Sequence, residues 1–70
     1  MNCYWYRECK TSDGEWALEV KRGVLPIGNI LKNGTTGKYE FFMGRDAVAT
    51  LLYEGYDLST LQQRIKVRQP

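Results

Sequence analysis

The feature that most constrains this fold is a pair of alternating segments joined by an Asp-Gly turn. Residues 15–21 alternate apolar with polar side chains, and residues 3–10 form a second strand-like run. A period of two places successive side chains on opposite faces of a β-strand, and Asp-Gly is a frequent hairpin turn. The sequence therefore predicts an opening β-hairpin with one apolar face. The apolar residues of its second strand are Trp16, Leu18 and Val20.

The length of the hairpin loop decides which face each residue of the first strand occupies. If the loop has an even number of residues, the side chains beside the apolar set are Cys3, Trp5, Arg7 and Cys9. Arg7 is the charged member, and its stem is expected to cover the edge of the core while its guanidinium reaches solvent. The opposite face would display Tyr4, Tyr6, Glu8 and Lys10, with Ala17, Glu19 and Lys21 from the neighbouring strand.

The middle of the chain contains two further strand-like runs. Pro26 and Gly28 interrupt residues 24–31, which indicates a short, bulged or edge strand. Residues 39–43 form the next strand, after a loop rich in Asn, Gly and Thr. A five-residue loop would set Leu31 against Tyr39 and Ile27 against Met43. A two-residue Asn-Gly turn would instead set Ile30 against Gly37. We favour the longer loop because it gives the large side chains large partners.

After Gly44 the period of the apolar residues becomes helical. Val48, Leu51 and Leu52 follow i, i+3, i+4 spacing, which predicts a short helix. Asp46 is its expected N-cap and Gly55 its C-terminal stop.

A second helix is predicted to begin near Asp57 or Ser59, because Ser59-Thr60-Leu61-Gln62 matches a capping box. Its apolar stripe consists of Leu58, Leu61 and Ile65. A chain of 70 residues makes one domain rather than two. We therefore expect residues 1–70 to form a single α+β domain. Its small antiparallel sheet would contain three to four strands, arranged as β-hairpins and packed against one or two C-terminal helices.

The cysteine and histidine counts limit what can stabilise or activate this domain. Cys3 and Cys9 are the only cysteines, and within one strand they would lie about 20 Å apart, too far for a disulfide. There is no histidine, so we expect no metal site and no cofactor. We expect both thiols to be buried and reduced, as in a cytoplasmic protein. No segment resembles a signal peptide or a membrane span.

No set of residues in the sequence specifies a reaction. Glu8 and Glu19 could be cross-strand neighbours that share a proton, but pairing with Lys10 and Lys21 is the simpler expectation. Residues 34–38 superficially suggest a nucleotide-binding loop, yet they lack the full spacing and join two strands. We therefore predict no catalytic residues and a protein that is not an enzyme.

The expected solvent face of the hairpin is the best candidate for a binding surface. Tyrosine is an amphipathic contact residue, and charges of both signs can specify a protein partner. The predicted contact residues are Tyr4, Tyr6, Glu8, Lys10, Glu19 and Lys21. The partner would be a larger protein or a second copy of the chain. In its shortness and lack of catalytic groups the chain is similar to accessory proteins of bacteria and their phages.

Nucleic-acid binding is the alternative function. The order of strands and helix over residues 3–53 resembles the small three-stranded DNA-binding domains of certain transcription factors and integrases, which read the major groove with the sheet. This sequence lacks their dense arginine face, and its strand carboxylates would oppose a polyanion. The residues expected to carry this alternative are Lys10, Lys21, Arg22, Lys32, Lys38, Arg64, Lys66 and Arg68.

Overall fold

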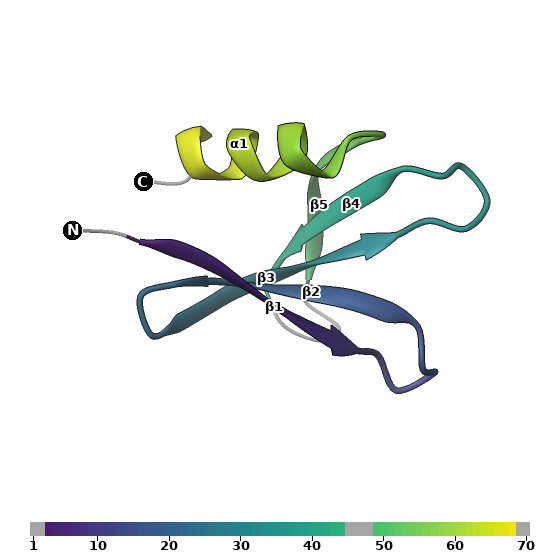
Figure 1. Cartoon of the computed structure of the whole chain (residues 1–70), viewed down its shortest axis with the longest axis horizontal. Coiled ribbons are helices and arrows are strands. Elements are labelled where there is room, and N and C mark those ends of the chain that lie inside the picture. Colours follow the sequence, from purple (N-terminus) through teal and green to yellow (C-terminus); the bar gives the residue numbers. More distant parts are fainter. Residues whose placement is uncertain (1–2, 45–48, 69–70) are drawn as a thin grey trace.

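The chain folds into an antiparallel sheet followed by a C-terminal helix (Figure 1). The computed structural model describes residues 3–44 and 49–68. Its elements are β1 (Tyr4–Lys10), β2 (Trp16–Arg22), β3 (Leu25–Lys32), β4 (Tyr39–Met43), β5 (Thr50–Gly55) and α1 (Leu58–Arg68). Each strand pairs with the next in sequence order, so β1 and β5 form the two edges of a 5-stranded sheet. The α+β class is confirmed, with a larger sheet than the expected three to four strands.

The first hairpin has an odd loop, which reverses the expected faces of β1. The Thr11 N–H donates to the Glu15 carbonyl at 2.9 Å and so encloses residues 12–14. Gly14, at φ +83°, supplies the left-handed residue that such a three-residue loop requires. Because strand side chains alternate, a shift of one residue moves every β1 side chain to the other face.

The register of β1 against β2 therefore corrects the predicted pairing. Tyr6 lies opposite Val20, whereas Arg7 lies opposite Glu19. The residues of β1 that share a face with Trp16, Leu18 and Val20 are Tyr4, Tyr6, Glu8 and Lys10. The prediction that Trp5, Arg7 and Cys9 face the core is wrong. The expectation of buried thiols is also wrong, because Cys3 is exposed and Cys9 is partly exposed.

The register between β3 and β4 differs by one residue from the favoured alternative. Lys32 pairs with Tyr39 and Ile30 with Phe41, and the Asn33 N–H donates to the Lys38 carbonyl at 2.8 Å, so the loop encloses residues 34–37. The Asn33 side-chain oxygen accepts hydrogen bonds from the Thr35 and Thr36 amides at 2.8 and 3.1 Å, which stabilises this connection. The irregularity expected near Pro26 is confirmed, since the register against β2 shifts there.

Residues 50–55 form a strand, so the helix predicted around Leu51 and Leu52 is wrong. Tyr53 pairs with Phe41, and a register shift next to this pair places Leu51 opposite Phe42. Pairing with β5 satisfies backbone hydrogen-bonding groups of β4 that would be unpaired if β4 were an edge strand. These hydrogen bonds outweigh the weak preference that helical spacing gives. Gly55 ends β5 rather than a helix, and Asp46 and Val48 lie outside the described residues.

The C-terminal helix is confirmed, and Asp57 is its N-cap. The predicted capping box is wrong, because Ser59 lies within the helix. The Asp57 carboxylate accepts hydrogen bonds from the Thr60 amide at 3.0 Å and from the Thr60 hydroxyl at 2.5 Å. These hydrogen bonds lower the pKa of Asp57 below its usual value. Leu61 and Ile65 are buried and Leu58 packs against them, as the predicted stripe requires. In the described ranges, no helix is long and apolar enough to cross a membrane.

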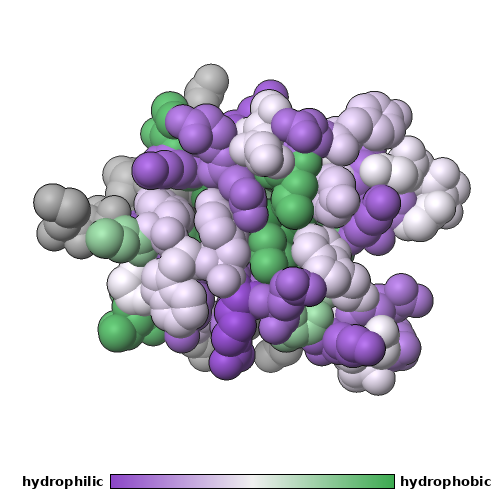
Figure 2. All heavy atoms as spheres, viewed as in Figure 1, coloured by the Kyte–Doolittle hydropathy of each residue, from purple (hydrophilic) through white to green (hydrophobic). Residues whose placement is uncertain are grey.

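The core lies between α1 and one face of the sheet, which we call the inner face. It consists of Leu18, Val20, Ile30, Phe41, Leu61 and Ile65. Trp16 packs against this cluster and forms an edge-to-face pair with Tyr39, at a centroid distance of 5.7 Å. The prediction that helix covers the Trp16, Leu18 and Val20 face is therefore confirmed. In Figure 2, hydrophobic residues are visible in the middle of the molecule, between hydrophilic ones.

Candidate interaction surface

The six predicted contact residues do not form one surface. Tyr4, Tyr6, Glu8 and Lys10 lie on the inner side of β1, whereas Glu19 and Lys21 lie on the opposite face of β2. The sheet therefore separates the tyrosines from two of the charges that were expected to accompany them. Glu8 and Glu19 point to opposite faces and are not cross-strand neighbours, and Glu19 pairs with Arg7 rather than with the expected Lys21.

Tyr6 belongs to the margin of the core. Its ring packs against the buried cluster, and its hydroxyl donates to the Gln62 carbonyl of α1 at 3.4 Å. Burial raises the pKa of the Tyr6 phenol above 10.0, and the neighbouring Tyr4 phenol adds to this effect. The phenol rings of β1 thus lie on the side that the helix covers, and the prediction that they face away from it is wrong.

This pKa shift predicts how stability depends on pH. Folding favours the neutral phenol of Tyr6. The stability that this phenol contributes is therefore fully present below about pH 10 and is lost as pH rises through the raised pKa. Urea unfolding of the wild type and Tyr6→Phe at about pH 8 and about pH 11 measures this difference. We expect the wild type to lose more stability than Tyr6→Phe. Equal losses in the two proteins would contradict the assignment.

The face of the sheet opposite α1, which we call the outer face, has an apolar centre. The register sets Ala17 against Leu31, and Asn29 against Phe42. These residues line a hollow of about 430 Å³ that also includes Cys9 and Ala49. Its full lining is Cys9, Lys10, Thr11, Ala17, Asn29, Leu31, Phe42, Gly44 and Ala49. Apolar hollows of this size are typical of sites that receive one or two side chains or a small ligand.

Trp5 lies on the same face, four residues along β1 from Cys9, and is held in place by two contacts. Its indole N–H donates to the Gly23 carbonyl at 2.7 Å, and Lys21 Nζ lies 4.6 Å from the ring centroid. The side chain is nevertheless 43% exposed. Next to it, Arg7 Nη2 lies 3.1 Å from Glu19 Oε1. The outer face thus presents an anchored aromatic ring beside a paired cation and anion.

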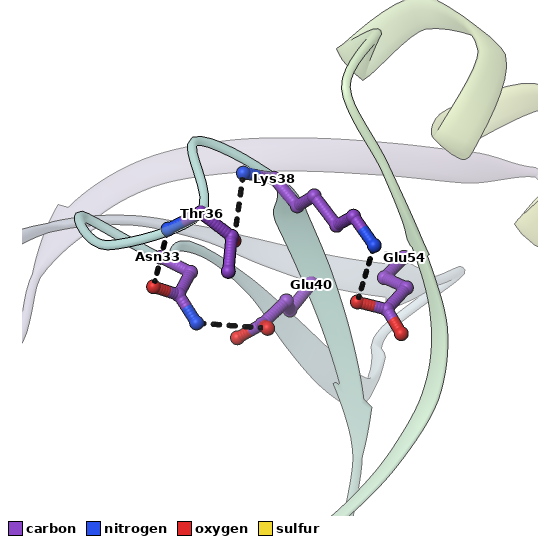
Figure 3. A network of polar contacts seen from close by, with 5 residues as sticks. All are labelled: Asn33, Thr36, Lys38, Glu40 and Glu54. Atoms are coloured by element: carbon purple, nitrogen blue, oxygen red, sulfur yellow. Dashed lines mark hydrogen bonds and ion pairs between the residues drawn. The ribbon is translucent and has the colours of Figure 1, made fainter.

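Two carboxylates lie on the β4–β5 side of the outer face (Figure 3). Glu40 and Glu54 are directly opposed across the two strands. Asn33 Nδ2 donates to Glu40 Oε2 at 3.2 Å, and Lys38 Nζ lies 3.7 Å from Glu54 Oε1. These separate partners offset the repulsion between like charges at opposed positions. In the part of the chain that the structure describes, no group of three potential ligands could hold a metal ion.

The residues predicted for nucleic-acid binding are dispersed over the molecule. Lys10, Arg22 and Lys32 share the inner-face register, whereas Lys21 lies on the outer face. Arg64 and Lys66 are exposed on α1. Three of the lysines lie over aromatic rings, at 4.6, 5.3 and 5.5 Å from the centroids. These lysines are Lys21 over Trp5, Lys32 over Tyr39 and Lys38 over Tyr56.

The sequence-based prediction missed Trp5, Leu31 and Phe42 as members of an accessible face. Gly14 was the available signal, because a glycine at the third loop position is typical of an odd hairpin loop. Comparisons with models of protein families, with curated proteins and with solved structures gave no match.

Proposed function

We propose that this chain is a non-catalytic interaction module that binds a protein partner through the outer face of its sheet. The hollow between Ala17, Leu31 and Phe42 is the observation that supports this proposal most directly. Trp5 strengthens it, because this residue lies on the same face of the sheet, and a half-exposed, anchored indole is typical of the residues that dominate binding energy at protein interfaces.

The charges of the outer face indicate which kind of partner fits this face. Arg7 and Lys21 lie on the β1–β2 side, and Glu40 and Glu54 lie on the β4–β5 side. A protein that inserts an aliphatic or aromatic side chain can complement both sides, with its own carboxylates near Lys21 and its cations near Glu40. A polyanion would meet the two carboxylates instead, so the geometry favours a protein over a nucleic acid.

The test compares a glutamate introduced inside the hollow with a glutamate introduced outside it. Proteins retained from a lysate by the immobilised wild type are identified, and the affinity of each purified candidate is measured by calorimetry. We expect Leu31→Glu to weaken binding at least about tenfold, because the new carboxylate would be buried in the contact. Leu25→Glu is the matched control, since Leu25 lies on the same strand but is 57% exposed and outside the hollow.

Two outcomes would contradict this proposal. The first is equal affinity of Leu31→Glu and the wild type for the partner, once circular dichroism has shown that Leu31→Glu and Leu25→Glu are both folded. The second is a gel shift of DNA or RNA at about 50 mM salt that disappears by about 200 mM, which would assign the protein to phosphate-driven binding. We expect no such shift.

A further inference from the structure

The edge of β1 that faces away from β2 is oriented to pair with another strand. The Cys3 carbonyl accepts from the Gly23 amide, and the Thr11 amide donates to the Glu15 carbonyl, both at 2.9 Å. Odd-numbered residues of β1 therefore direct their backbone groups toward β2. The direction of the backbone N–H and C=O groups alternates along a strand, so Tyr6 and Glu8 direct their backbone groups away from β2. Among the described residues β1 pairs only with β2, and such an edge is a template for strand addition.

The side chains of β1 disfavour two of the registers in which it could pair with a second copy. Opposed residues of an antiparallel pair have their side chains on the same face of the sheet. In a symmetric pair of β1 strands the two-fold axis therefore passes beside one residue, which lies opposite its own copy. An axis beside Glu8 would set Glu8 against Glu8, and an axis beside Arg7 would set Arg7 against Arg7. Like charges at directly opposed positions are destabilising. An axis beside Tyr6 avoids both conflicts.

We propose that two copies of this chain associate through their β1 edges, antiparallel, with the two-fold axis beside Tyr6. In this register Tyr6 faces the second copy's Tyr6, and Trp5 faces the second copy's Arg7. Cys3 faces the second copy's Cys9. This contact forms at the edge of the sheet. It shares Trp5, Arg7 and Cys9 with the outer face, but it does not use Ala17, Leu31 or Phe42 of the hollow.

The contacts already present on β1 suit this arrangement. Lys21 approaches the Trp5 ring from β2 at 4.6 Å, which leaves the side toward the edge for the second copy's Arg7. Arg7 can keep its contact with Glu19, because that residue lies on β2. The half-buried Tyr6 ring at the margin of the core would gain a second ring beside it. A small core would thereby be extended across the two-fold axis.

The two cysteines report the register directly. Cys3 and the second copy's Cys9 would form a non-hydrogen-bonded pair, with Cα atoms about 4.5 Å apart, inside the range of a disulfide. Within one chain the same two residues are about 20 Å apart along an extended strand. A link between Cys3 and Cys9 therefore joins two chains.

The experiment is thiol cross-linking with diamide, which accepts two electrons and two protons from each pair of thiols. We expect the wild type to form a covalent dimer whose peptide map contains Cys3 linked to Cys9. Cys3→Ser and Cys9→Ser alone should each cross-link at least about tenfold more slowly, because each retained thiol faces a serine. An equimolar mixture of the two variants should restore the covalent dimer.

Sedimentation without oxidant gives an independent measurement. We expect a concentration-dependent dimer for the wild type and for Glu8→Ala, and a monomer for Glu8→Pro, because proline removes an edge donor without removing a bond to β2. Leu31→Glu should leave cross-linking unchanged, which separates this contact from the outer face. A monomer at every concentration, or equally fast cross-linking of the single-serine variants, would overturn the proposal.

Discussion

Phe41→Ala is expected to unfold most of the protein at 25 °C. Phe41 is 0% exposed, stacks on Tyr53 at a centroid distance of 6.1 Å and packs in the cluster that includes Leu61 and Ile65. Removing a buried phenylalanine ring costs about 3–5 kcal/mol. A domain of this size rarely has more than about 3–5 kcal/mol of stability from its core. The far-ultraviolet spectrum and its thermal transition measure the loss.

Val24→Ala is the control for this substitution. Val24 is 87% exposed in the turn between β2 and β3, so its truncation should change the free energy of unfolding by less than about 0.5 kcal/mol. If Phe41→Ala melted cooperatively within a few degrees of Val24→Ala, the assignment of Phe41 to the centre of the core would be wrong.

Gly28→Ala is expected to have the second-largest effect. A Cβ at this position would lie 2.3 Å from the Phe42 carbonyl oxygen, 2.8 Å from Phe41 Cε1 and 3.1 Å from Met43 Cα. Two of these atoms belong to the backbone of β4, so the strands would have to separate. Overpacking of this kind costs about 2–3 kcal/mol. At about 4–8 °C per kcal/mol, the melting temperature should fall by about 10–20 °C.

Gly34→Ala provides the matched comparison. A Cβ at Gly34 would meet no heavy atom within 4 Å. The same chemical change in the β3–β4 loop should therefore leave the free energy of unfolding within about 0.5 kcal/mol. Equal melting temperatures for the two alanine variants would refute the close approach of β3 to β4 at Gly28.

Local signals in the sequence were sufficient for several elements. The Asp13-Gly14 turn and the alternation of Trp16, Leu18 and Val20 specified the first hairpin and the inner face of β2. Asp57 as the start and the spacing of Leu61 and Ile65 specified α1, whereas the Ser59 capping box did not. In each case a few neighbouring residues carry the information, because turns and caps are satisfied by hydrogen bonds within four residues.

The faces of β1 and the nature of residues 50–55 depended on contacts between distant segments. One added loop residue reverses every side chain of a strand, so the placement of Tyr6 and Trp5 followed from the closure of residues 12–14. Leu51 and Leu52 fit a helix or a strand equally well, and pairing with β4 selected the strand. Composition and local pattern specify which residues prefer burial. The partner that buries them is chosen when the whole sheet forms, because backbone hydrogen bonds between strands are satisfied only there.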